Sequence, residues 1–138
     1  MSLIDCMILG DSLAVGVAKF RPECAAYAQV GINSSDFTNR YILNTKGTEA
    51  KSVIISLGSN DTAKLDTLEE LETLRQMVTA DRVYWILPNI KETKRKAVWM
   101  IANKYKDTVI DARNYDRSPD NVHPTMRGYK EIAQETKK

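Results

Sequence analysis

Residues 4–10 read Ile-Asp-Cys-Met-Ile-Leu-Gly, and this stretch decides the fold. Its apolar residues are nearly continuous and a glycine ends it, which is typical of a strand buried on both faces. Similar short apolar runs, each closed by a turn-forming residue, are found at residues 24–30, 52–57, 82–87 and 108–110. Such strands belong to parallel sheets whose two faces are covered by helices.

Segments with helical periodicity separate the predicted strands. Apolar residues recur at helical spacing in residues 68–78, 97–105 and 126–133, and shorter helices are expected at residues 13–20 and 35–43. Ser34 or Ser35 is the expected N-cap of the second helix, and Pro124 marks the start of the last. Because strands and helices alternate, we expect residues 1–138 to form a single α/β domain with helices on both faces of a parallel sheet.

The composition is that of a globular protein. The chain has 138 residues, 43% of them hydrophobic, and a formal net charge of +2, which excludes a disordered chain. No apolar run approaches the ~20 residues of a membrane-spanning helix, and the first residues lack the basic region of a signal peptide. We therefore expect a cytoplasmic protein with no membrane partner.

Two features of the composition have a structural and a functional interpretation. Cys6 and Cys24 lack the spacing of a metal site and are too few for a disulfide framework, so we interpret both as buried, reduced thiols. Basic residues are concentrated at positions 91–106, on one predicted helix. This is either a patch for an anionic polymer or a solvated helix face. The sequence pI of 8.5 favours the solvated face, and we expect no nucleic-acid partner.

Four polar clusters follow the predicted strands, at residues 10–13, 31–34, 58–61 and 120–123. Because the carboxyl ends of parallel strands meet at one edge of the sheet, where such folds bind ligands, these clusters are expected to lie together. Ser12 would be a nucleophile at a strand-to-helix turn, and it needs a base. His123 is the chain's only histidine, and Asp120 is placed to orient it.

The same edge offers an oxyanion hole. Asn60 has a side-chain N–H for a developing negative charge, and the backbone N–H groups of Ser12 and of a residue near Gly31 would complete the hole. The sequence therefore predicts catalytic residues Ser12, Asp120 and His123, with Ser12, Gly31 and Asn60 binding the oxyanion.

These motifs resemble those of the SGNH (GDSL) hydrolases. Gly10-Asp11-Ser12-Leu13, Gly58-Ser59-Asn60-Asp61 and Asp120-x-x-His123 are similar to the first, third and fifth sequence blocks of that family. The resemblance implies a flavodoxin-like three-layer α/β/α fold with a five-stranded sheet, and ester hydrolysis by Ser, His and Asp without a metal or organic cofactor. In the family, a glycine after the second strand donates its N–H to the oxyanion. Gly31 is the favoured candidate, and another register would place Ser34 there.

Each residue also has a purely structural interpretation. Ser12 is a possible helix N-cap, Asn60 and Asp61 are possible turn residues, and Asp120 and His123 possible loop residues. Their convergence on one edge favours a site. Asp11 is interpreted as a brace and Asp61 as a turn former. Asn33 is a candidate either for lining an acyl pocket or for an ordinary loop role. Residues 114–117 could form part of the rim, but a solvated loop is favoured. Tyr84, Trp85 and Trp99 could form a carbohydrate platform, but core packing is favoured.

Three rival functions remain. Asp11, Asn60, Asp61, Asp120 and His123 are potential ligands of a metal-dependent phosphoesterase, but such sites usually need several histidines. A nucleotide-binding module would need a glycine-rich phosphate loop, and the sequence contains no such motif. An inactive relative that binds a carbohydrate or a protein is the non-enzyme alternative. The short chain leaves little length for a lid, so we expect an open pocket and a small acyl-ester substrate, with an O-acetylated carbohydrate as the first class to test.

Overall fold

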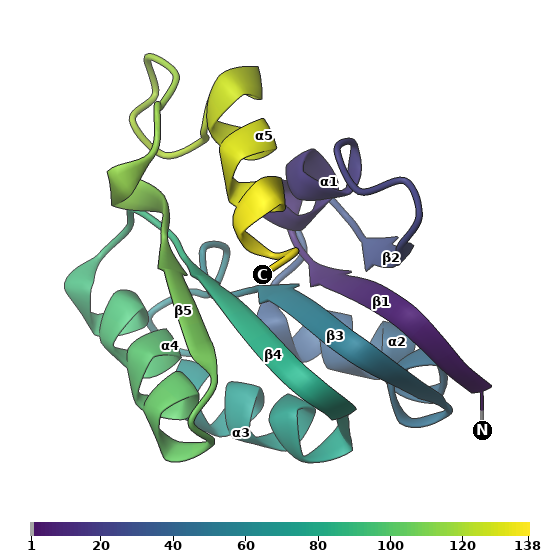
Figure 1. Ribbon diagram of the computed structural model, residues 1–138. Helices are drawn as coiled ribbons and strands as arrows, with labels where there is room; N and C mark the ends of the chain where they lie inside the picture. Colours follow the sequence, from purple (N-terminus) through teal and green to yellow (C-terminus); the bar gives the residue numbers. More distant parts are fainter. Residues whose placement is uncertain (1) are drawn as a thin grey trace.

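The computed structural model describes residues 2–138 and contains a five-stranded sheet (Figure 1). Its strands lie in the order β2-β1-β3-β4-β5, and all neighbours pair in parallel. The bounds are Ser2–Gly10 for β1, Ala25–Ala28 for β2, Thr48–Ser56 for β3, Thr79–Leu87 for β4 and Thr108–Asp111 for β5.

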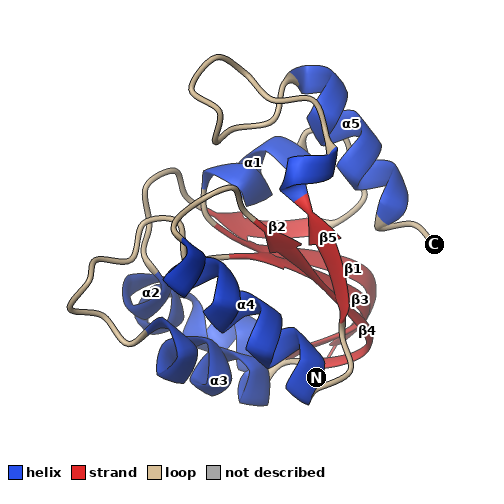
Figure 2. Cartoon of the chain, turned by 90° about the vertical axis from the view of Figure 1, so that its left-hand side faces the viewer, coloured by secondary structure: helices blue, strands red, loops and turns tan. Residues whose placement is uncertain are grey.

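Helices cover both faces of the sheet, which gives three layers (Figure 2). One face carries α2 (Ser34–Lys46), α3 (Thr67–Met77) and α4 (Glu92–Lys104). The other carries α1 (Ser12–Ala18) and α5 (Met126–Glu135), and a short 3-10 helix, η1 (Ala112–Asn114), follows β5. The predicted three-layer α/β/α fold with a parallel five-stranded sheet is confirmed.

Each face of the sheet has its own core because side chains alternate along the strands. Trp85 of β4 is fully buried against Phe37 of α2 and Val98 of α4 on one face. Ile8 of β1 packs with Leu13 of α1 and Ile132 of α5 on the other. These cores fix the positions of the strand ends, from which the polar loops emerge.

The strand order reverses at β1. The chain passes from β1 outward to β2 and then returns to the other side of β1 as β3. In such folds the carboxyl ends of the strands that flank this reversal form a ligand-binding crevice. The loops after β1, β2 and β3 start at that place, and they contain Ser12, Gly31 and Asn60.

Several local expectations were wrong. β3 and β4 begin about three or four residues earlier than their apolar runs, because their polar first residues still pair through the backbone. Asn33, rather than Ser34 or Ser35, caps α2. Trp99, expected in the core, is 52% exposed, and Met126, on the predicted apolar stripe of the last helix, is exposed as well. None of the helices within residues 2–138 is long and apolar enough to cross a membrane.

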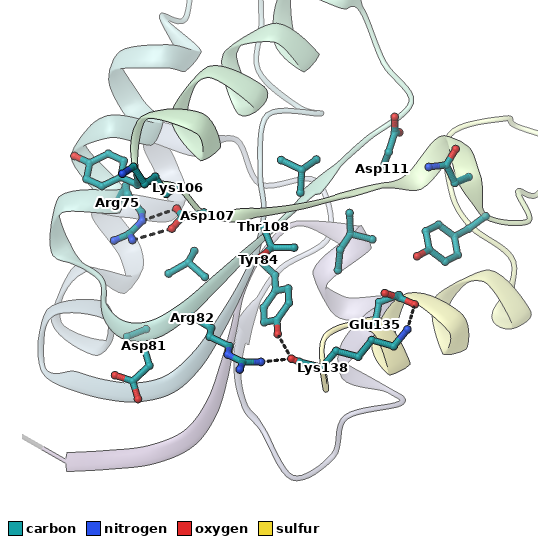
Figure 3. A pocket seen from close by; sticks show the side chains of 17 residues that line it. Arg75, Asp81, Arg82, Tyr84, Lys106, Asp107, Thr108, Asp111, Glu135 and Lys138 are labelled. Atoms are coloured by element: carbon teal, nitrogen blue, oxygen red, sulfur yellow. Dashed lines mark hydrogen bonds and ion pairs between the residues drawn. The ribbon is translucent and has the colours of Figure 1, made fainter.

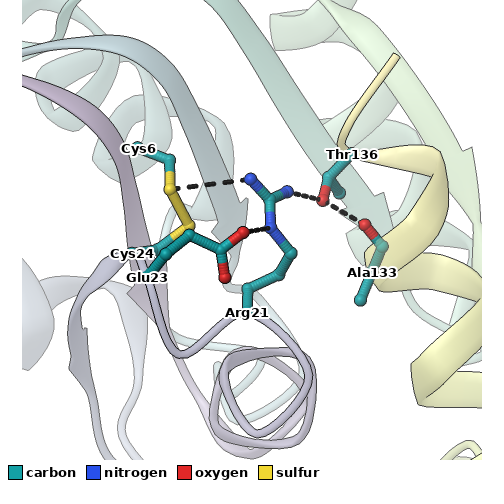
Figure 4. Close-up of a disulfide and its surroundings, with 6 residues drawn as sticks. All are labelled: Cys6, Arg21, Glu23, Cys24, Ala133 and Thr136. Carbon is teal, nitrogen blue, oxygen red and sulfur yellow. Dashed lines mark hydrogen bonds and ion pairs between the residues drawn. A yellow bond between two sulfur atoms is a disulfide. The ribbon is translucent and has the colours of Figure 1, made fainter.

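The two cysteines form a disulfide, so the prediction of reduced thiols was wrong (Figure 4). Met7 of β1 pairs with Ala25 of β2, and this register places Cys6 beside Cys24, with their Cα atoms 4.8 Å apart. Register depends on how the intervening helix packs, which residue spacing does not reveal. Arg21 covers the bridge: its guanidinium lies 3.6 Å from Cys6 Sγ and also bonds Glu23.

Candidate active site

Ser12 is placed by a tight junction between β1 and β3. Gly10 has a φ of +141°, and a side chain there would collide with the Ser56 carbonyl oxygen. Asp11 then caps α1, with its Oδ1 accepting the Leu13 N–H at 3.1 Å. Ser12 is thus the first residue of α1 and not its N-cap, so the capping interpretation of Ser12 is wrong. Its side chain is left free for another contact.

That contact is with His123. The Ser12 Oγ lies 3.0 Å from His123 Nε2, across 111 positions of sequence. On the other side of the ring, His123 Nδ1 lies 2.6 Å from Asp120 Oδ2. The loop after β5 therefore brings its imidazole and carboxylate to the start of α1, in a continuous chain of hydrogen bonds. This is the spacing that proton transfer from a serine hydroxyl requires.

Asp120 also organises its own loop. Its Oδ1 accepts the backbone N–H groups of Val122 and His123 and the Ser118 hydroxyl, each at 2.9 Å. The hydrogen bond to the His123 ring, followed by those backbone bonds, holds the pKa of Asp120 well below its ordinary value. The carboxylate is therefore ionised at neutral pH and orients the imidazole.

A second group of contacts holds this loop from outside. Asn89, in the loop after β4, donates to the Asn121 carbonyl at 2.6 Å and accepts from Arg113 Nε at 2.7 Å. Arg117 bonds the Asn121 side chain at 2.9 Å. Asn121 has a φ of +61°, a conformation in which asparagine is enriched. The sequence analysis missed Ser118 and Asn89, and it included Asn121 in the cluster 120–123 without a role. The only available signal was this asparagine, which follows the predicted orienting residue Asp120.

The loops after β2 and β3 are joined to each other. Asn60 donates one side-chain N–H to the Ile32 carbonyl at 3.0 Å. Asp61 accepts the Ser34 N–H at 2.8 Å and its hydroxyl at 2.6 Å, and it also accepts the Thr67 hydroxyl. Asp61 therefore connects two loops, a larger role than the predicted turn former. Gly31 is exposed, with a φ of +83° and open space beside its Cα.

Asp11 is fully buried behind Ser12. Its Oδ1 also accepts the Ser56 hydroxyl at 2.9 Å, and its backbone N–H donates to the Ser56 carbonyl. Desolvation raises the pKa of Asp11 to about 6. Tyr129 of α5 packs against Gly16 of α1, and burial raises its pKa to about 12. The predicted brace is thus present, and it is an ionisable one.

Other candidates lie away from this constellation. Asn33 caps α2 through its side chain, and the segment 114–117 contributes Arg117, which bonds the Asn121 side chain.

The basic residues of α4 are largely paired. Lys94 bonds the Thr62 and Leu65 carbonyls and the Thr67 hydroxyl. Arg95 pairs with Asp111, and Lys104 pairs with Glu72. α4 also ends before Lys106, which the sequence placed on that helix. Tyr84 and Trp85 are buried, as predicted.

A hollow of about 650 Å³ lies elsewhere, over β4, β5 and the end of α5 (Figure 3). Charged side chains of both signs line it, among them Arg82, Glu135 and Lys138. Within residues 2–138, no three of the Asp, Glu, His and Cys side chains gather as a metal site would require.

Solved structures share this architecture at low sequence identity. A GDSL-like lipase from Bacteroides thetaiotaomicron matches with a TM-score of 0.66 and 16% identity, over 94% of this chain and 84% of that one. The chain has the SGNH hydrolase fold.

Two further solved structures have the same fold. The catalytic domain of a peptidoglycan O-acetyltransferase from Streptococcus pneumoniae matches with a TM-score of 0.64 and 16% identity, over 96% and 89% of the two chains. A carbohydrate acetylesterase from Sinorhizobium meliloti matches with a TM-score of 0.63 and 14% identity, over 96% and 97%. No family model and no curated protein matches the sequence. At these identities the likeness establishes the fold alone.

Proposed function

We propose that this protein is a serine esterase that hydrolyses small acyl esters, with acetyl esters of carbohydrates as its substrate class. The observation that carries the proposal is the hydrogen-bonded chain from Ser12 Oγ through the His123 ring to Asp120. The fold shared with lipases, an acetyltransferase and a carbohydrate acetylesterase supports acyl chemistry at this place.

The proposed reaction has two halves. Ser12 Oγ attacks the ester carbonyl while His123 Nε2 accepts its proton, and Asp120 stabilises the imidazolium that forms. The tetrahedral intermediate collapses, His123 protonates the leaving alcohol, and the acyl group remains on Ser12. His123 then takes a proton from water, which attacks the acyl-enzyme and releases the carboxylic acid.

The oxyanion is bound by N–H groups from three loops in this proposal. They are the backbone N–H groups of Ser12 and Gly31 and the Asn60 side-chain N–H that does not bond Ile32. The register that would use Ser34 is disfavoured, because the Ser34 N–H is already donated to Asp61. No metal or organic cofactor enters these steps.

The preference for a small acyl group rests on the loops. A single residue separates β1 from α1, which begins at Ser12, and the side chains of Asp120 and His123 are about half exposed. Such an open site offers little apolar surface to a long acyl chain, so acetyl esters are favoured. A carbohydrate is proposed as the alcohol because two proteins with this fold are a peptidoglycan O-acetyltransferase and a carbohydrate acetylesterase.

Labelling by a serine-directed fluorophosphonate tests the proposal directly. The wild-type protein should be labelled at one residue, and Ser12→Ala should not be labelled. Ser59→Ala is the matched control, because the Ser59 hydroxyl has no hydrogen-bond partner among residues 2–138. Acetate release from an O-acetylated xylooligosaccharide, measured with the same three proteins, then tests the substrate class.

Failure of the folded wild-type protein to label would contradict the proposed nucleophile. Labelling without acetate release would retain the nucleophile and reject the carbohydrate ester. Acetate release that requires a divalent ion would indicate metal-dependent hydrolysis in place of the serine mechanism. Acetyl transfer to an added sugar in preference to water would identify a transferase in place of a hydrolase.

A further inference from the structure

Asp11 is a buried ionisable group that the proposed reaction does not use. It precedes the nucleophile, is fully buried, and makes two side-chain hydrogen bonds through one oxygen: Oδ1 accepts the Leu13 N–H and the Ser56 hydroxyl. Its second oxygen, Oδ2, is buried with no hydrogen-bond partner among the described residues. Burying a carboxylate with one oxygen unpaired is costly.

Helix capping alone does not account for this cost. Asparagine caps a helix about as well as aspartate and brings no charge to bury, and Asn33 does so for α2 in this chain. A charged acceptor, however, makes stronger hydrogen bonds than a neutral one. An ionised Asp11 therefore holds the first turn of α1 more firmly to β3 than an amide would.

We propose that Asp11 is a positioning residue whose ionised carboxylate holds the first turn of α1 against β3 and so aims the Ser12 hydroxyl at His123. The inference rests on the proposed function. Ser12 begins α1, and its Oγ must stay within reach of His123 Nε2, 3.0 Å away. Small displacements of a reacting group lower rates strongly, so a weaker hold on this turn reduces turnover without changing substrate binding.

The consequence is a protonation of Asp11 that lowers turnover in acid. Burial raises the pKa of Asp11 to about 6, so its carboxylate gains a proton in mildly acidic solution. Ser56 of β3 bonds Asp11, and Tyr129 of α5, whose pKa burial raises, lies close enough for the charges of Asp11 and Asp120 to raise that pKa further; Asp120 itself is on the loop after β5. In this range of pH, Asp120 stays ionised and Tyr129 stays neutral, because their pKa values lie far below and far above it. In mildly acidic solution, protonation of Asp11 therefore lowers turnover.

The pH dependence of kcat and KM for p-nitrophenyl acetate tests this. In the wild type, kcat should fall about tenfold in a step centred near pH 6, as Asp11 gains its proton. Asp11→Asn should lack this step and have a kcat about tenfold lower at alkaline pH, with KM unchanged. Asp66→Asn is the matched control: Asp66 caps α3 through Glu69 N–H in an exposed position, and its substitution should leave the profile unchanged. An Asp11→Asn profile identical to the wild type would overturn the proposal.

A second measurement separates this inference from the esterase proposal. The Leu13 amide proton donates to Asp11 Oδ1, so its NMR chemical shift should titrate near pH 6, and it should do so in inactive Ser12→Ala as well. Absence of this titration overturns the role of Asp11 even if esterase activity is present.

If Asp11→Asn does not fold, Ser56→Ala replaces it. Loss of the Ser56 hydrogen bond should raise the pKa of Asp11 and so move both the midpoint of the Leu13 amide shift and the step in kcat to higher pH, and unchanged values would contradict the proposal.

Discussion

The nucleophile and the base of the candidate site are held in opposite ways. Ser12 follows a buried strand, and the residue before it, Asp11, has a fully buried carboxyl group. The junction between strand and helix leaves no space for a side chain at Gly10. His123 and Asp120 lie on the loop between η1 and α5, and their side chains are 43% and 51% exposed. One half of the site is part of the core, and the other lies on the surface.

The difference lies in what keeps each group in place. Packing and strand pairing hold Ser12, so a change beneath it alters the stability of the whole domain. Hydrogen bonds from Ser118, Asn89 and the loop's own N–H groups hold His123. A change there loosens one loop and should lower activity with little loss of stability. The predictions below test this contrast.

Removing either partner of the central contact should have the largest effect. Ser12→Ala and His123→Ala should each lower kcat at least about 10⁴-fold, because nucleophile and base act as a unit. The double variant should be no worse than either single one. Hydrolysis of p-nitrophenyl acetate measures this, with Ser59→Ala as the control. Additive losses would mean that the two residues act separately.

Removing the proposed side-chain donor to the oxyanion should have the next largest effect. Asn60→Ala should lower kcat by about 10²–10³ with little change in KM. Asn103→Ala, a substitution of an exposed asparagine on α4, is the control. A loss below about threefold would remove Asn60 from this role and leave it as a tie to the Ile32 carbonyl.

The disulfide belongs to the buried half of the site. It joins residues separated by 18 positions, and its loss should lower the free energy of unfolding by about 3 kcal/mol. Urea unfolding of the Cys6→Ala/Cys24→Ala double variant measures this, with the reduced wild type as a second preparation. Activity in the absence of denaturant should change little. A large loss of kcat at unchanged stability would contradict the division between the two halves.

Two braces, one on each half, provide a direct comparison. Asp61→Ala leaves the Ser34 N–H unpaired and should cost about 1–3 kcal/mol of stability. Asn89→Ala removes the contacts to Asn121 and Arg113 and should lower kcat up to about tenfold with a smaller change in stability. Thermal unfolding and kcat, measured on both variants, give the comparison. Equal effects on stability would show that the two halves are held alike.

At a pH below the range in which Asp11 gains its proton, acid should also loosen the exposed half, and this is the smallest expected effect. The pKa of Asp120 is lowered from 3.8, so its contribution to loop order is complete above about that pH and is lost as pH falls towards its folded-state value. The NMR signals of the Val122 and His123 amide protons, which donate to Asp120 Oδ1, should shift in this range. Core amides such as that of Ile54 should not, and a simultaneous change in both would indicate global unfolding.

The residues at the strand ends could be predicted from sequence because the information is local. The end of a buried strand such as residues 4–10 can be recognised from the glycine that closes its apolar run, and parallel pairing places the carboxyl ends of all the strands on one edge of the sheet. Ser12 and Asn60 are found just beyond the ends of β1 and β3, whereas Asp120 and His123 lie farther along the chain, on the loop between η1 and α5. Contacts that depend on register or on loop conformation were missed, among them the Cys6–Cys24 bridge and the Asn89 brace. The exposure of Trp99 depends on how far α4 is rotated, which periodicity does not fix.

The disulfide also bears on the predicted cytoplasmic location. Disulfides persist in oxidising compartments and are rare in the reducing cytosol. The buried bridge beneath Arg21 is therefore more consistent with an oxidising environment.

The Cys6–Cys24 bridge encloses Ser12 in a covalent ring. Trypsin cuts after Lys19 but not at Arg21, which precedes Pro22, so one digestion product carries Ser12 with Cys6 and the next carries Cys24 with Gly31. Without a reductant these two peptides stay linked. A mass spectrum of the unreduced digest would therefore report the adduct on the serine, the state of the thiols and the peptide containing Gly31 in a single ion.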